Sequence, residues 1–196
     1  MDTPLHVAVL LGSTREGRFG PVVASWIRDH LDRRPDMTAD VIDLVETPLP
    51  TVFPELGRPP ASDEAAGLLA AVSPRMAAAD AFVIVTPEYN RSFPAALKNA
   101  IDWHNREWQA KPVGFVAYGG FSAGLRAVEQ LRLVLAELHA VTMRDAVGLQ
   151  APWAQLGPDG TTPNPGGDAA AKAMLDQLAW WGRALREARA ARPYGM

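Results

Sequence analysis

The chain has 196 residues, of which 48% are hydrophobic and 21% charged, the balance of one globular domain covering residues 1–196. Its net charge of −3 leaves no basic excess to hold a phosphate backbone, so we expect no nucleic-acid partner. It contains no cysteine, which excludes disulfides, iron–sulfur clusters, thiolate metal sites and cysteine nucleophiles.

The chain carries no targeting or metal-binding pattern. Its first residues have no basic segment followed by a long apolar run, so no signal peptide is expected. The longest apolar runs are too short to cross a bilayer, so we expect no membrane partner and a cytoplasmic location. The four histidines are scattered without ligand spacing, so no metal site is expected.

Apolar runs and helical patterns alternate along the chain. Short runs rich in branched residues predict buried strands at 6–11, 38–44, 81–86, 113–118 and 141–149. Helical spacing of apolar residues predicts helices over 21–34, 62–79, 94–105, 124–140 and 168–190. Gly20 is the expected N-cap of the first helix, and Pro74 is expected to kink or break the second. Trp26 and Trp181 lie on apolar stripes and are expected in the core.

Five buried strands, each followed by a helix, predict an α/β protein with a parallel sheet covered on both faces. Right-handed crossovers then give a three-layer α/β/α, flavodoxin-like fold with strand order 2-1-3-4-5. In such a sheet, ligands bind beyond the carboxyl ends of the strands, where the strand order reverses. We therefore look for chemistry in the loops after the first, third and fourth strands.

The loop after the first strand, residues 12–20, reads GSTREGRFG and leads into a helix. Hydroxyl groups, guanidinium groups and glycines just before a helix N-terminus favour binding of a phosphate group. The loop is neither a G-x-G-x-x-G fingerprint nor a Walker A loop. An ordinary polar turn is the alternative.

The other two loops add aromatic and small residues. In the loop after the third strand, Tyr89 and Phe93 can form a wall for an aromatic ring, and Asn90 can meet ring nitrogens and carbonyls. The loop after the fourth strand contains Gly-x-Ser-x-Gly around Ser122, the pattern of a hydrolase nucleophile. A serine hydrolase is therefore an alternative, but the only histidine after Ser122 is His139, at the end of the next predicted helix.

Three motifs at these strand ends match one family in the same order: LGSTR at 11–15, PEYNRSFP at 87–94 continuing into ALKNAIDW at 96–103, and YGGFSAG at 118–124. On these motifs, residues 5 to 150 resemble the NAD(P)H-dependent FMN reductases, a group that includes quinone, azo-dye and chromate reductases of flavodoxin-like fold. The resemblance implies an oxidoreductase that uses FMN with NADPH or NADH. It also implies a small-molecule acceptor, a ping-pong cycle, and a homodimer or homotetramer.

The resemblance also implies the residues that bind the cofactor. The first loop would hold the FMN phosphate, and the other two would border the ring and the ribityl chain. The residues concerned are Ser13, Thr14, Arg15, Arg18, Phe19, Gly20, Pro87, Glu88, Tyr89, Asn90, Tyr118, Gly119, Gly120 and Ser122. No residue is expected to act as a catalytic acid or base, because the flavin carries the chemistry.

Two departures from the family pattern concern charge and backbone. Many members have Gly where this chain has Arg91, so either the backbone differs there or Arg91 reaches a nicotinamide phosphate. Many have Ser and Asn where this chain has Arg18 and Gly20, so Arg18 would supply charge in place of hydroxyl groups. Two other functions stay open: an electron carrier of the flavodoxin type, although such carriers are more strongly acidic, and a flavin-binding sensor without turnover.

Overall fold

The computed structural model describes residues 3–55, 58–60, 62–157, 159–160 and 164–195. The strands are β1 (Leu5–Leu11), β2 (Met37–Asp43), β3 (Ala81–Pro87), β4 (Pro112–Gly119), β5 (Val141–Thr142) and β6 (Val147–Gln150). The helices are α1 (Gly20–Asp32), α2 (Asp63–Ala78), α3 (Ala95–Asp102), α4 (Leu125–Glu137) and α5 (Pro165–Ala191), with a short 3-10 turn at Pro152–Ala154.

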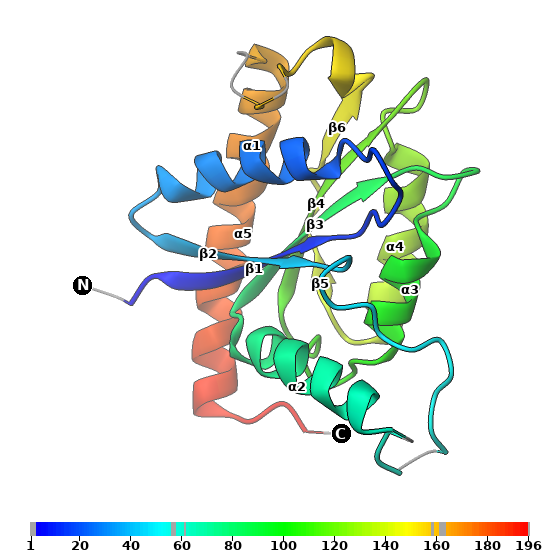
Figure 1. The fold of residues 1–196 in the computed structure, drawn as a ribbon. Helices are drawn as coiled ribbons and strands as arrows, with labels where there is room; N and C mark the ends of the chain where they lie inside the picture. Colours follow the sequence, from blue (N-terminus) through cyan, green and yellow to red (C-terminus); the bar gives the residue numbers. More distant parts are fainter. Residues whose placement is uncertain (1–2, 56–57, 61, 158, 161–163, 196) are drawn as a thin grey trace.

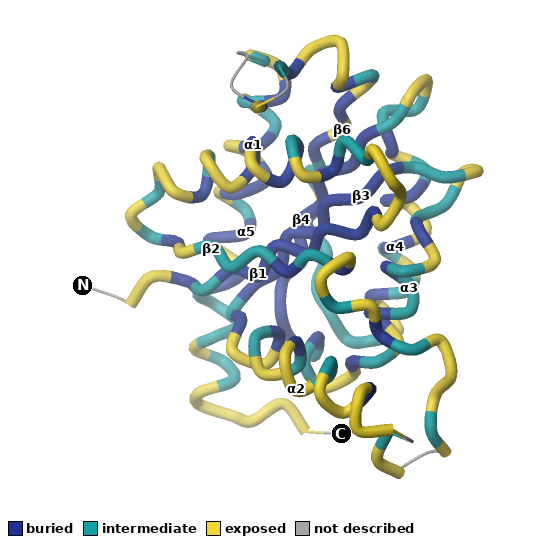
Figure 2. Tube along the Cα trace, in the orientation of Figure 1, coloured by how far each residue is buried: buried dark blue, intermediate teal, exposed yellow. Residues whose placement is uncertain are grey.

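All strand pairs are parallel, and the order β2-β1-β3-β4-β5, with β6 also beside β4, confirms the predicted topology. α1 and α5 cover one face of the sheet, and α2, α3 and α4 cover the other (Figure 1). The middle strands β1, β3 and β4 are almost wholly buried, because apolar side chains on both their faces pack against a helical layer (Figure 2). The fold is therefore the flavodoxin-like α/β/α sandwich, and the loops after its strands share one edge.

The fifth predicted strand is wrong in one respect, because it is two short strands, β5 and β6, separated by residues 143–146. The Arg132 guanidinium donates hydrogen bonds to the backbone carbonyls of Met143 and Arg144, at 2.5 and 2.9 Å. Asp145 in turn bonds to the side chain of Gln177 on α5. Side chains of the flanking helices thus satisfy backbone groups that a continuous strand would pair with β4.

Three local predictions also need correction. α2 runs without a break through Pro74, because Val72 and Met76 are fully buried and the Ser62 side chain caps the first turn. The N-cap of α1 is Phe19, and Gly20 is the first helical residue. Trp26 is buried as expected, but Trp181 is 38% exposed.

Three further aromatic residues differ in how far they are buried. Trp108 is fully buried against Phe82 in the core, and the Trp103 indole donates to the Pro50 carbonyl. Phe121 lies exposed on the β4–α4 loop. In the described part of the chain, no helix is both long and apolar enough to cross a membrane.

Candidate cofactor site at the carboxyl edge of the sheet

The loops after β1, β3 and β4 meet around a cavity of about 370 Å³ at the carboxyl edge of the sheet. We call it the edge cavity. It is lined by Ser13, Arg15, Gly17, Arg18, Phe19, Pro87, Glu88, Tyr89, Tyr118, Gly119, Gly120 and Trp153. Its size falls in the range of small-molecule and cofactor sites, and its position is the expected one for this sheet.

A hydrogen bond joins the β1–α1 loop to the β3–α3 loop. The Ser13 side chain is buried, with only 1% of the residue exposed, and its hydroxyl lies 2.9 Å from the Tyr89 hydroxyl. The two residues come from the ends of adjacent parallel strands, so the strand order brings their side chains together. This contact closes one side of the edge cavity.

Arg18 is held by an acidic partner. Its guanidinium makes two hydrogen bonds to the Asp43 carboxylate, at 2.6 and 2.5 Å, and a third to the Ser13 carbonyl. The hydrogen bonds that Arg18 donates to the Asp43 carboxylate raise the pKa of Arg18, although burial opposes the change. The positive charge of Arg18 is thus largely compensated, and the side chain fastens the first loop to the end of β2.

The N-terminus of α1 opens without a protein cap. Phe19 at the N-cap offers no side-chain acceptor, and the first turn holds no acidic residue. The first amide groups of a helix lack partners within the helix, and together with the helix dipole they favour an anion. This arrangement fits the phosphate of a nucleotide cofactor.

Gly20 and Tyr118 meet at this helix end. A Cβ on Gly20 would lie 2.7 Å from Leu11 Cδ1 and 2.9 Å from the Tyr118 hydroxyl, so only glycine fits. Tyr118 is 4% exposed, and its hydroxyl is buried without a hydrogen-bond partner in the described part of the chain. Burial raises the pKa of Tyr118 to about 12, against a smaller opposing influence of Ser13.

The β3–α3 loop is a tight turn. Tyr89 and Ser92 exchange backbone hydrogen bonds of 2.8 and 2.9 Å, and the two residues between them, Asn90 and Arg91, have φ of 49° and 69°. Two consecutive positive φ values are typical of a two-residue type I′ turn. Asn90 points out as an exposed residue and does not line the edge cavity.

Glu88 links the β3–α3 loop to the β4–α4 loop. Its carboxylate accepts the Ser122 hydroxyl at 2.6 Å and the Arg126 backbone amide at 3.1 Å, so it caps α4. Burial alone would raise the pKa of Glu88, but these hydrogen bonds outweigh it and lower the pKa.

The contacts of Ser122 bear on the serine hydrolase alternative, since its hydroxyl donates to the Glu88 carboxylate. His139, beyond the far end of α4, has its ring beside the Tyr194 hydroxyl at 3.1 Å. The Ser–His contact of a hydrolase is absent from the described residues.

Ten of the fourteen residues expected to bind cofactor line the edge cavity. Gly20 and Ser122 lie behind its wall, and Asn90 and Thr14 face elsewhere. Two lining residues were missing from the expected set, Gly17 and Trp153. Trp153 directly follows β6, so its position at the carboxyl end of the last strand was the feature of the sequence that could have predicted it.

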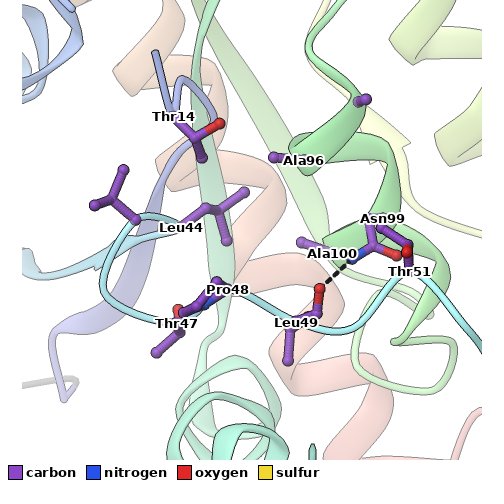
Figure 3. Close-up of a pocket in the computed structure, with 11 residues that line it drawn as sticks. Thr14, Leu44, Thr47, Pro48, Leu49, Thr51, Ala96, Asn99 and Ala100 are labelled. Atoms are coloured by element: carbon purple, nitrogen blue, oxygen red, sulfur yellow. Dashed lines mark hydrogen bonds between the residues drawn. The ribbon is translucent and has the colours of Figure 1, made fainter. Parts of the chain in front are cut away.

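Thr14 borders a second cavity of about 400 Å³. Figure 3 shows Thr14, Leu44 and Ala96 around this space, between the β1–α1 loop, the segment after β2 and the start of α3. The Asn99 amide donates to the Leu49 carbonyl at 2.8 Å and holds the segment after β2 against α3. Ser13 and Arg15, the neighbours of Thr14 in the chain, line the edge cavity instead.

The family model for NADPH-dependent FMN reductases matches residues 5–154, which carry all three loops. The chain belongs to this family. Among curated relatives, an NAD(P)H-dependent FMN reductase of Saccharomyces cerevisiae is 32% identical over 82% of this chain and 85% of its own length. A quinone reductase of Escherichia coli is 35% identical over 73% of this chain and 76% of its own. An FMN reductase of Schizosaccharomyces pombe is 36% identical, and the chain spans 60% of that protein's length.

A solved structure supports the fold. The flavoenzyme NAD(P)H:(acceptor) oxidoreductase FerB of Paracoccus denitrificans superposes with a TM-score of 0.74 at 24% identity, covering 92% of this chain and 98% of its own. Family membership makes the protein an oxidoreductase of the NAD(P)H-dependent FMN and quinone reductase type. The edge cavity fits FMN, since it joins an uncapped helix N-terminus to aromatic rings and a Gly119-Gly120 backbone that brings no Cβ obstacle.

Proposed function

We propose that the protein binds FMN in the edge cavity and uses NADPH or NADH to reduce a small acceptor such as a quinone, a flavin or an azo compound. The observation that carries the proposal is the meeting of the three family motifs around one cavity at the switch point of the sheet. The relatives named as FMN and quinone reductases support the same reaction class.

The residues divide by the part of FMN that each would hold. Ser13, Arg15 and the start of α1 would bind the phosphate, and Glu88 and Tyr89 would border the ring. Backbone amides at Gly119 and Gly120 would donate to the ring edge, because a flat ligand can approach the backbone closely at Gly120, where a Cβ would meet nothing within 4 Å. Trp153, which is exposed on the rim, would shield the cofactor from water on one side.

FMN, when bound, supplies the chemistry, since it can take a hydride from NAD(P)H and pass electrons to an acceptor in a ping-pong cycle. The protein's own part is to bind, to orient and to fix the loops. Glu88 does this by holding Ser122 and the first turn of α4 in place. We assign no residue as a proton donor or acceptor.

A serine hydrolase is disfavoured by the bond from Ser122 to Glu88 and by the position of His139. A carrier of the flavodoxin type is disfavoured by the modest net charge of −3. The homodimer or homotetramer and the cytoplasmic location stay predictions.

Initial-rate kinetics test the proposal. We expect NADPH oxidation to require both FMN and an added quinone, with parallel double-reciprocal lines when NADPH and quinone are varied. Hydrolysis of a p-nitrophenyl ester that is lost in Ser122→Ala, with no NADPH oxidation, would establish the hydrolase instead.

A further inference from the structure

The hydroxyl of Tyr118 is an unusual polar group for a protein interior. Tyr118 stands at the carboxyl end of β4, 4% exposed, and its oxygen has no hydrogen-bond partner in the described part of the chain. Leaving a buried hydroxyl unbonded costs free energy. Such an atom points to a partner that is present when the protein works.

The neighbouring polar groups are committed elsewhere. The Ser13 hydroxyl bonds to the Tyr89 hydroxyl at 2.9 Å, and the Arg18 guanidinium bonds to Asp43. Ser13 lies close enough to lower the pKa of Tyr118 slightly, but by geometry neither group makes a hydrogen bond to the Tyr118 hydroxyl in the described part of the chain. Tyr118 lines the edge cavity, so a ligand bound there is the partner for which the structure leaves room.

The position of the hydroxyl identifies the chemistry of that partner. It lies beside Gly20, the first residue of α1, at the distance where a Cβ on Gly20 would clash with it. The thirteen-residue helix α1 presents its uncapped N-terminus at the same point. A helix N-terminus favours an anion, and a phenol hydroxyl beside it favours an acceptor that carries negative charge.

We propose that the Tyr118 hydroxyl donates a hydrogen bond to the 5′-phosphate of FMN at the N-terminus of α1 and so favours FMN over riboflavin. This inference rests on the proposed function and assigns Tyr118 to the phosphate rather than to the ring. It also gives a reason for Arg18 and Gly20, since Arg18 fastens the loop and Gly20 leaves room for the phenol.

The protonation of Tyr118 is consistent with a donor role. Because its pKa lies at about 12, the hydroxyl keeps its proton throughout the neutral range and meets a phosphate dianion as a neutral donor. A phenolate in this place would repel the phosphate.

The test compares two flavins that differ only in the phosphate. Flavin-free Tyr118→Phe and wild-type protein are titrated with FMN and with riboflavin, following the quenching of flavin fluorescence. We expect the Kd for FMN to rise about 10-fold to 100-fold in the variant, as for a lost hydrogen bond to a charged group, and the Kd for riboflavin to stay unchanged. Tyr194→Phe, at the opposite end of the molecule, is the matched control and should change neither affinity.

The stability of the flavin-free variant gives a second readout. Because the hydroxyl has no protein partner, flavin-free Tyr118→Phe should be at least as stable as the wild type, while the rise in Tm on adding FMN should shrink. An unchanged FMN affinity, an equal loss for both flavins, or a marked loss of stability without flavin would overturn the inference. Wild-type protein that binds neither flavin would instead contradict the proposed function.

Discussion

At the scale of single residues, the edge cavity is organised by side chains that bind one another before any ligand arrives. Ser13 bonds to Tyr89, Arg18 to Asp43, and Glu88 to Ser122. Each pair joins loops that are distant in sequence. The conformational entropy cost of ordering these loops is therefore met when the protein folds. Less entropy is then lost from the loops when a cofactor binds.

The Arg18–Asp43 pair gives the first prediction. These side chains are only 15% and 16% exposed, so removal of Asp43 leaves a largely buried guanidinium without its partner. We expect Asp43→Asn to lower the free energy of unfolding by about 1–3 kcal/mol, measured by urea denaturation.

Asp32→Asn is the control for this prediction. Asp32 pairs with Arg28 on the surface of α1, where the Arg28 and Asp32 side chains are 59% and 50% exposed. Its loss should cost less than about 0.5 kcal/mol. Equal effects of the two substitutions would show that Arg18 does not fasten the loop.

Sequence motifs identified the loops but not the direction of every side chain. Composition alone could not show that Arg18 faces Asp43, because the pair forms only when β1 and β2 lie side by side. For the same reason, Thr14 looked equivalent to Ser13, yet it borders the other cavity. Adjacent loop residues diverge in direction, and only the backbone path decides which one meets a ligand.

At the scale of elements, the tight turn between Tyr89 and Ser92 explains why many family members carry glycine where this chain has Arg91. The φ of 69° at Arg91 lies in the left-handed region, which costs a non-glycine residue about 1–2 kcal/mol. We expect Arg91→Gly to raise the free energy of unfolding by about 0.5 kcal/mol, because relief of strain exceeds the entropy cost of glycine.

The control for the turn is a glycine placed in a helix. Arg28→Gly, at an exposed position within α1, should lower the free energy of unfolding by about 0.5–1 kcal/mol. If Arg91→Gly is destabilising to the same extent, the left-handed conformation of the turn is contradicted. Both are measured by urea denaturation.

Elements with a strong local signal were predicted well, and those decided by distant contacts were not. The apolar runs of β1, β3 and β4 predicted a parallel sheet covered on both faces, because strands buried on both faces are continuously apolar. The strand order followed from the right-handed crossover rule. The split between β5 and β6 depends on Arg132 reaching two carbonyls, and the unbroken α2 depends on buried Val72 and Met76. Neither contact has a signature in the local sequence.

At the scale of the whole molecule, the end of the sheet opposite the edge cavity holds a buried cation. Lys111, at the start of β4, is 6% exposed and donates to the carbonyls of Met76 and Ala77 at the end of α2. Burial, with a smaller contribution from Arg189, lowers its pKa from 10.5 to about 8.

This shift predicts how stability depends on pH. Between pH 8 and 10.5 the unfolded chain holds a proton on Lys111 that the folded protein has lost, so stability rises with pH in that range. We expect the free energy of unfolding of the wild type, measured against Lys111→Met, to rise by on the order of 1–3 kcal/mol from pH 7 to 10.

Lys172→Met, on the exposed side of α5, is the control. The difference in free energy of unfolding between this variant and the wild type should not change between pH 7 and 10. A flat profile for Lys111→Met as well would show that the buried cation does not titrate there.

The central claim is that the edge cavity binds FMN and that NADPH reduces it. The most direct measurement is the visible absorption spectrum of the purified protein, with FMN added if needed, before and after NADPH under anaerobic conditions. We predict a two-banded flavin spectrum that bleaches on addition of NADPH, with FMN released when the protein is denatured. Added FMN that neither binds nor becomes reduced would contradict the account.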